Sequence, residues 1–150
     1  MFFRKRKKKL IEKMKLGVDM VKMGTFRRLA HRFKGEYGEE AKLLAGAVTN
    51  ELFSVPPATG KGEEFSDRNR GRIREELSKL KEDHKIRAAV TEAVRVDAVV
   101  RFESGEPETG MYAVEQLAKK GILISGGDVP SPSVFFMMAS NYLGETEALE

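Results

Sequence analysis

Apolar residues recur at helical spacing along most of the chain, and this pattern predicts a mainly α-helical protein. Within residues 10–33 they fall three, four or eight positions apart, at Leu10, Met14, Val18, Val21, Leu29 and Phe33. Lysines occupy much of the opposite face. Gly24 followed by Thr25 predicts a break, with Thr25 as the N-cap of a second short helix.

The middle of the chain carries two more stretches with this period. A helix is predicted from Glu39 to Val55, because two prolines follow Val55 and stop it. Residues 56–64 concentrate proline and glycine, which is typical of a loop. Ser66 is the predicted N-cap of the next helix, whose buried face carries Ile73, Leu77 and Leu80. In this charged helix we expect surface ion pairs of Arg72 with Glu76, and of Arg70 with Glu75 or Glu63.

The C-terminal third predicts two helices separated by a loop. Residues 110–120 have helical period and end in Lys119, Lys120 and Gly121, the usual signature of a helix C-terminus. Residues 126–133 read GGDVPSPS and predict a turn leading to a helix cap. The last helix is predicted at 134–143, before Gly144.

Residues 85–103 fit both a helix and a strand. Ile86, Ala89, Val90, Ala93, Val94 and Val100 share a helical face, whereas Val94, Val96, Ala98, Val100 and Phe102 alternate as in a strand. A strand here would form a small β-α-β unit at 94–125, but two strands make a marginal sheet. We therefore predict an all-α fold, a compact bundle of five or six helices with a basic N-terminal extension, and keep an α+β fold as the alternative.

The length of 150 residues predicts a single domain. Residues 1–9 are predicted to be a polybasic N-terminal extension and residues 10–144 a helical domain that the loop at 56–64 could divide. Residues 145–150 are expected to be a frayed tail.

Composition argues against several classes of function. The chain has no cysteine and only two histidines, His31 and His84, which excludes disulfides and thiolate chemistry and leaves little material for a metal centre. Gly60-Lys61-Gly62 lacks the remaining residues of a phosphate-binding Walker loop. No serine nucleophile motif or metal-ligand spacing is present, so we expect a non-catalytic protein with no cofactor and no metal. We infer no small-molecule partner from the sequence.

Charge is divided sharply along the chain. Residues 1–34 hold 13 Lys and Arg against Glu12 and Asp19, a net charge of +11, and the remaining residues carry a net charge of −7. Residues 102–150 account for −6 of that total. Such asymmetry predicts a basic segment that seeks an anionic partner, or that pairs with the acidic C-terminal third of its own or another copy.

The basic segment begins MFFRKRKKK, and the charged residues after it leave no apolar stretch for a secretory signal. The predicted anion-binding residues are Arg4, Lys5, Arg6, Lys7, Lys8, Lys9, Arg27, Arg28 and Arg32. Our first hypothesis is a cytoplasmic binding domain whose basic end docks on an anionic surface, most simply membrane phospholipid. The alternatives are association with nucleic acid through the same residues and self-association as a structural or regulatory protein.

Overall fold

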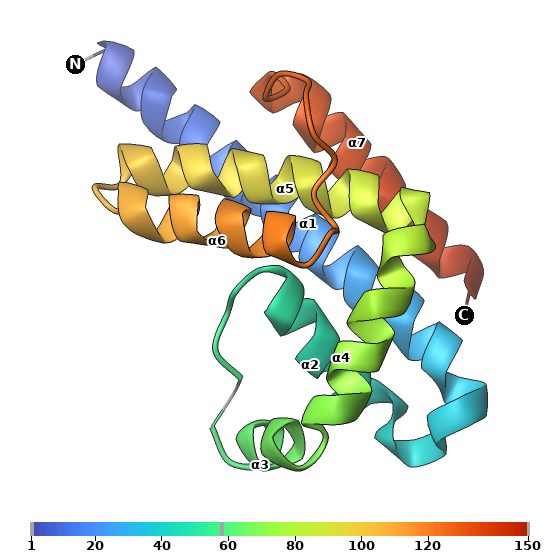
Figure 1. Ribbon diagram of the computed structural model, residues 1–150. Helices are drawn as coiled ribbons and strands as arrows, with labels where there is room; N and C mark the ends of the chain where they lie inside the picture. The colour runs from blue at the N-terminus through green and yellow to red at the C-terminus, as the bar shows by residue number, and fades with distance from the viewer. Residues whose placement is uncertain (1, 58, 150) are drawn as a thin grey trace.

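The described residues form helices joined by loops, with no strand among them, which confirms the predicted all-α fold (Figure 1). The computed structural model describes residues 2–57 and 59–149, with side chains from Lys5 onward. The helices are α1 (Phe2–Tyr37), α2 (Ala41–Leu52), α3 (Lys61–Arg68), α4 (Arg70–Lys79), α5 (His84–Glu103), α6 (Pro107–Lys119) and α7 (Pro132–Gly144). The described residues also contain three short 3-10 helices: η1 (Gly38–Glu40), η2 (Leu80–Glu82) and η3 (Glu145–Leu149).

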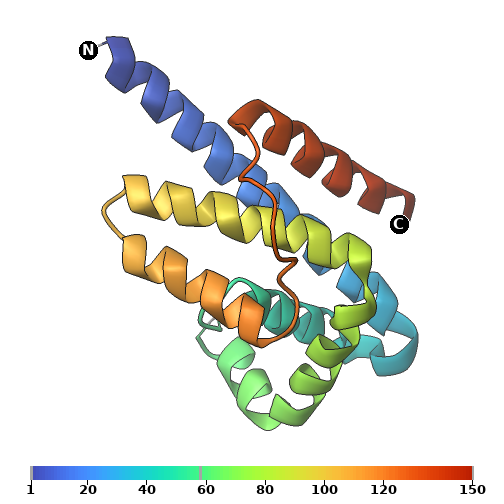
Figure 2. The ribbon, with the colours of Figure 1, turned by 45° about the horizontal axis from the view of Figure 1, so that its top comes forward.

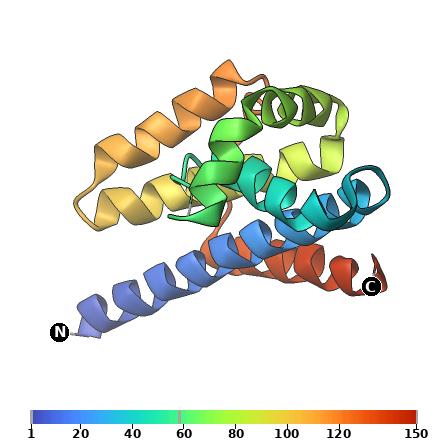
Figure 3. The same ribbon diagram turned by 90° about the horizontal axis from the view of Figure 1, so that it is seen from below.

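Helix α1 is the element around which the others are arranged. It packs against α7, α2 and α5, while α6 folds back along the far side of α5 as an antiparallel hairpin (Figures 1 and 3). The core lies between these helices. Its largest fully buried side chains include Leu29, Phe33, Phe53, Leu117 and Phe135.

The predicted break at Gly24 and Thr25 is wrong, because α1 continues through both residues. A Cβ atom on Gly24 would lie 2.8 Å from the ring of Tyr142, and one on Gly17 would lie 2.6 Å from the ring of Phe135. The glycines let α7 approach closely. Thr25 is not a cap, since its hydroxyl forms a buried hydrogen bond of 2.9 Å with the Tyr142 hydroxyl. Packing against α7 thus offsets the cost of about 1 kcal/mol for glycine inside a helix.

The ambiguous stretch at 85–103 is helical over its whole length, as α5. The side chain of Asp83 caps its N-terminus by accepting a hydrogen bond of 3.0 Å from the Ile86 amide. After α6 the chain crosses α5 without forming a strand (Figure 2). Its carbonyls accept hydrogen bonds from α5 instead, from Arg87 Nε to Ile122 at 3.0 Å and from Arg95 Nη2 to Ile124 at 2.7 Å.

Several predicted local contacts in the middle of the chain are also wrong. Ser66 is buried inside α3, and Asn69 occupies the N-cap position of α4. Helix α3 begins at Lys61, within the predicted loop at 56–64. The arginines of α4 form ion pairs with carboxylates outside this segment instead of the predicted pairs within it. Arg72 binds Glu40 at 2.9 Å and Arg70 binds Glu51 at 2.8 Å, because both carboxylates lie on neighbouring helical elements.

The segment after α7, predicted as a frayed tail over 145–150, contacts the bundle as far as it is described. Residues 145–149 form η3, and Thr146 within it is fully buried. The Thr146 hydroxyl donates a hydrogen bond of 2.6 Å to the Leu143 carbonyl. Glu145 forms ion pairs with Arg28 on α1 and Lys85 on α5. These contacts hold the segment against the bundle.

Candidate anion-binding sites

The N-terminal end of α1 extends past α7 and lies on the same side of the protein as the tip of the α5–α6 hairpin (Figures 1 and 3). Among the side chains described, Met14 is the first in the chain that is buried. The residues from Phe2 to Lys13 rise about 18 Å along the helix axis. Figures 1 and 3 show this end projecting past α7. The predicted extension is therefore a helical arm, continuous with the central helix; we call residues 2–13 the basic arm.

The cations of the basic arm surround its axis. Six consecutive cationic residues, Arg4 to Lys9, exceed one helical turn of 3.6 residues, so they cannot share one face. Lys5, Lys8 and Lys9 are exposed. Lys7 forms an ion pair of 2.6 Å with Glu103 at the end of α5. The side chain of Arg4, also a predicted anion ligand, lies outside the described side chains.

Electrostatics at the basic arm favour binding of an anion. The first turn of α1 contains no acidic residue. The positive end of the helix dipole and its unbonded N–H groups therefore coincide with a cluster of cations. Cations at this end destabilise a helix by about 0.3–1 kcal/mol each. An anionic surface would relieve that repulsion and accept hydrogen bonds from the free N–H groups.

The structure does not bring the other predicted anion ligands to the basic arm. Arg28 lies on α1 about 30 Å from its cationic end at 1.5 Å per residue. Arg28 joins α1 to the end of α7 and to η3, because its Nη2 donates hydrogen bonds to the Tyr142 carbonyl at 2.9 Å and to the Glu145 carboxylate at 2.8 Å. Arg32 pairs with Asp83. Arg27 is half-buried beside a separate groove of about 730 Å³ along α1.

The ionised groups at this junction stabilise one another. Hydrogen bonds from Lys85 and Arg28 lower the pKa of Glu145 below its ordinary value. Burial alone would raise the pKa of Asp83, but hydrogen bonds from the Ile86 amide and Arg32 bring it below its ordinary value. Burial also raises the pKa of Tyr142. Arg28 and Arg32 therefore serve as structural links between α1 and later elements.

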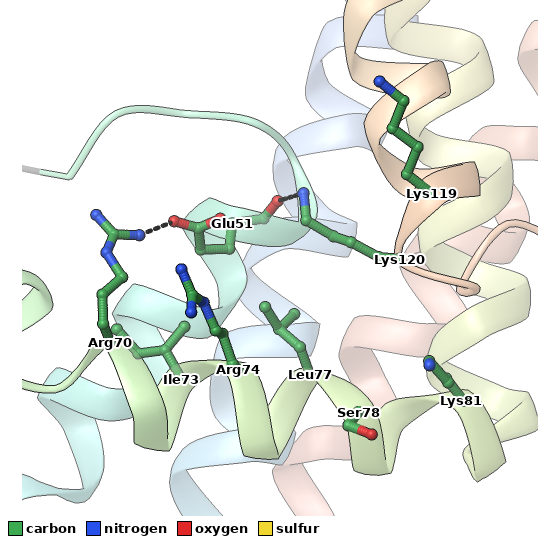
Figure 4. A pocket seen from close by; sticks show the side chains of 9 residues that line it. All are labelled: Glu51, Arg70, Ile73, Arg74, Leu77, Ser78, Lys81, Lys119 and Lys120. Atoms are coloured by element: carbon green, nitrogen blue, oxygen red, sulfur yellow. Dashed lines mark hydrogen bonds and ion pairs between the residues drawn. The ribbon is translucent and has the colours of Figure 1, made fainter.

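A second cationic feature is a cavity of about 370 Å³ between α2, α4 and the end of α6 (Figure 4). Arg70 and Arg74 extend from α4 toward Glu51, and Lys120 approaches Glu51 from the end of α6. Ile73 and Leu77 are the buried apolar part of the wall. The remaining lining residues are Ser78, Lys81 and Lys119. We call this the basic cavity.

The one carboxylate of the basic cavity is already engaged. Glu51 accepts a hydrogen bond of 2.8 Å from Arg70, and its backbone carbonyl accepts one of 2.9 Å from Lys120 Nζ. Burial lowers the pKa of Lys120 below its ordinary value, with Glu51 acting in the opposite direction. Within the described part of the chain, Arg74, Lys81 and Lys119 have no side-chain ion pair.

Sequence reasoning missed the basic cavity because its cations come from distant segments. The spacing of Arg70 and Arg74 places them on one side of a helix. Lys119 and Lys120 match the cationic last turn of a helix. Nothing in the sequence indicates that α4 and the end of α6 meet across the last turn of α2.

Comparison of the chain with models of known protein families, curated protein sequences and solved structures gives no match. Within the described residues, no helix is sufficiently long and apolar to cross a bilayer. The same part of the chain contains no group of three or more carboxylate or imidazole side chains arranged to hold a metal ion.

Proposed function

We propose that this protein is a non-catalytic, peripheral membrane-binding protein of the cytoplasm, which docks on anionic phospholipid through the basic arm of α1. The observation that carries the proposal is the position of the cations. They surround the free N-terminus of a helix that projects about 18 Å beyond its first buried side chain. When such a helix end contacts an anionic surface, its cationic side chains and the positive end of its dipole both attract that surface.

The charge layout favours a membrane over a long nucleic acid. The backbone of Phe2 and Phe3 forms the first turn of the arm, ahead of the cations. Aromatic residues at the end of a cationic segment can enter the interface between headgroups and acyl chains. The residues from 35 onward carry a net charge of −7, which would repel a polyanion that extends past the arm.

Vesicle cosedimentation tests this function with the full chain. Vesicles of phosphatidylcholine with or without phosphatidylserine are compared at low and at physiological salt. The arm variant is Lys5→Gln with Lys9→Gln, because both side chains are exposed and have no ion pair among the described residues. The control variant is Lys61→Gln with Arg68→Gln, which removes the same charge from exposed positions on α3.

The arm variant should bind phosphatidylserine vesicles about 30-fold more weakly than the wild type, since each cation near the surface contributes about 1 kcal/mol. The control variant should bind like the wild type. Equal binding by the arm variant and the wild type would show that the arm is not the anchor. Tighter binding to duplex RNA or DNA than to vesicles, with a steep salt dependence, would identify nucleic acid as the partner instead.

The same samples also distinguish self-association from membrane docking. Lys7 already pairs with Glu103 inside one chain, so part of the basic arm is neutralised without a second copy. Sedimentation equilibrium of the wild type and the arm variant measures the mass. Two results together would assign the arm to assembly instead of membrane docking. The wild type would be an oligomer and the arm variant a monomer, and the wild type would not bind vesicles.

A further inference from the structure

The basic cavity carries more positive charge than the protein around it neutralises. Its lining contains five cationic side chains and one carboxylate, a formal charge of +4. The negative ends of α2 and α6 offset about half a charge each. A charge of about +3 therefore remains, beside a buried wall of Ile73 and Leu77. A cleft lined by one sign of charge beside an apolar wall concentrates the field and attracts ions of the opposite sign.

The fold brings Arg70, Arg74 and Lys120 close to Glu51, while Lys81 and Lys119 line the other side of the cavity (Figure 4). Lys120 is held by the Glu51 carbonyl at 2.9 Å, and Arg70 by the Glu51 carboxylate at 2.8 Å. These two bonds join α4 and the end of α6 to the last turn of α2. Arg74, one turn after Arg70 on α4, faces the same space (Figure 4). The site is thus built around fixed donors, and Arg74 adds a planar fork suited to phosphate oxygens.

We propose that the basic cavity binds a small molecule bearing two or more phosphates. The remaining charge of about +3 matches a diphosphate better than a single phosphate or a carboxylate. The volume of about 370 Å³ lies within the range of small-molecule sites and exceeds what one ion fills. Arg74 supplies a donor beside Glu51 that no carboxylate among the described residues engages, and Lys81 and Lys119 add positive charge on the other side of the cavity (Figure 4).

The basic cavity is separate from the basic arm. Glu103, which pairs with Lys7, lies at the hairpin tip between α5 and α6. Lys119 and Lys120 lie at the opposite end of α6, about 18 Å along its axis from that tip. The two sites can therefore be tested independently.

Isothermal titration calorimetry with metal-free inorganic pyrophosphate tests the proposal on the full chain. The cavity variant is Arg74→Gln with Lys119→Gln, whose side chains are exposed and form no ion pair among the described residues. The control variant again is Lys61→Gln with Arg68→Gln, which removes one lysine and one arginine from outside the cavity. Circular dichroism verifies that both variants stay folded.

The wild type should bind pyrophosphate saturably at low salt and more tightly than inorganic phosphate. The cavity variant should bind at least about tenfold more weakly, because a hydrogen bond between charged groups contributes about that factor. The control variant should match the wild type. No saturable binding by the wild type, or equal weakening in both variants, would overturn the proposal.

The arm variant then separates a soluble ligand from a lipid headgroup of the same chemistry. Two proteins are mixed with phosphatidylcholine vesicles that contain a bisphosphorylated inositol lipid. One is the arm variant, and the other carries the arm and the cavity substitutions together. Vesicle binding that needs Arg74 and Lys119 would identify the headgroup as the ligand. Pyrophosphate binding without vesicle binding would identify a soluble one. Pyrophosphate binding that the arm substitutions abolish and the cavity substitutions spare would refute the site.

Discussion

The close contact between α1 and α7 predicts opposite effects for the same substitution at two glycines of one helix. Gly24 faces α7, and a Cβ atom there would lie 2.8 Å from two atoms of the Tyr142 ring. Gly35 lies near the end of α1, and a Cβ atom there would meet nothing within 4 Å. Gly24→Ala and Gly35→Ala therefore add the same methyl group in different surroundings.

Two free-energy terms decide each outcome. Alanine is favoured over glycine inside a helix by about 1 kcal/mol. Forcing a methyl group into a packed contact costs about 1–3 kcal/mol. Tyr142 cannot move away cheaply, because its side chain is 4% exposed and its hydroxyl is bonded to Thr25. We expect Gly24→Ala to lower the free energy of unfolding by up to about 2 kcal/mol and Gly35→Ala to raise it by up to about 1 kcal/mol.

Urea unfolding followed by circular dichroism measures both changes against the wild type. The difference between the two variants isolates the packing cost, since the helix preference of alanine is common to both. If Gly24→Ala stabilises the protein as much as Gly35→Ala does, α7 does not pack against this point of α1. In that case close packing of α7 is not the reason that α1 contains a glycine at position 24.

Two further contacts lead to predictions about stability. Because Lys85 and Arg28 lower the pKa of Glu145 in the folded state, this carboxylate stabilises the protein above its unfolded pKa of about 4.3 and loses that effect as the pH falls through the folded value. Glu145→Gln should therefore lose less stability than the wild type between about pH 5 and pH 3, as measured by urea unfolding. Tyr37 donates a hydrogen bond of 2.9 Å to the buried carboxylate of Glu76, so Tyr37→Phe should cost about 1–2 kcal/mol by thermal unfolding. An unchanged melting temperature would show that Lys79, which also binds Glu76, suffices for that carboxylate.

The candidate sites could be predicted only in part. The basic arm is visible in the sequence because its cations are consecutive, and consecutive residues stay together in any fold. Arg28 and Arg32 were predicted as anion ligands on charge alone, yet carboxylates from η3 and the N-cap of α5 hold them. The charge pattern of the sequence thus locates the cations, but it does not show which of them form ion pairs with carboxylates of the same chain.

By itself the sequence determined where apolar residues lie at helical spacing, and hence the all-α class. Proline pairs and the glycine after Lys120 also marked helix ends, because these residues act on the backbone through local geometry. Only the tertiary structure decided the rest. Gly24 is a contact point for Tyr142, and the basic cavity joins Glu51, Arg74 and Lys120 from three helices. Such features depend on which faces meet, and that is set by packing between residues far apart in the chain.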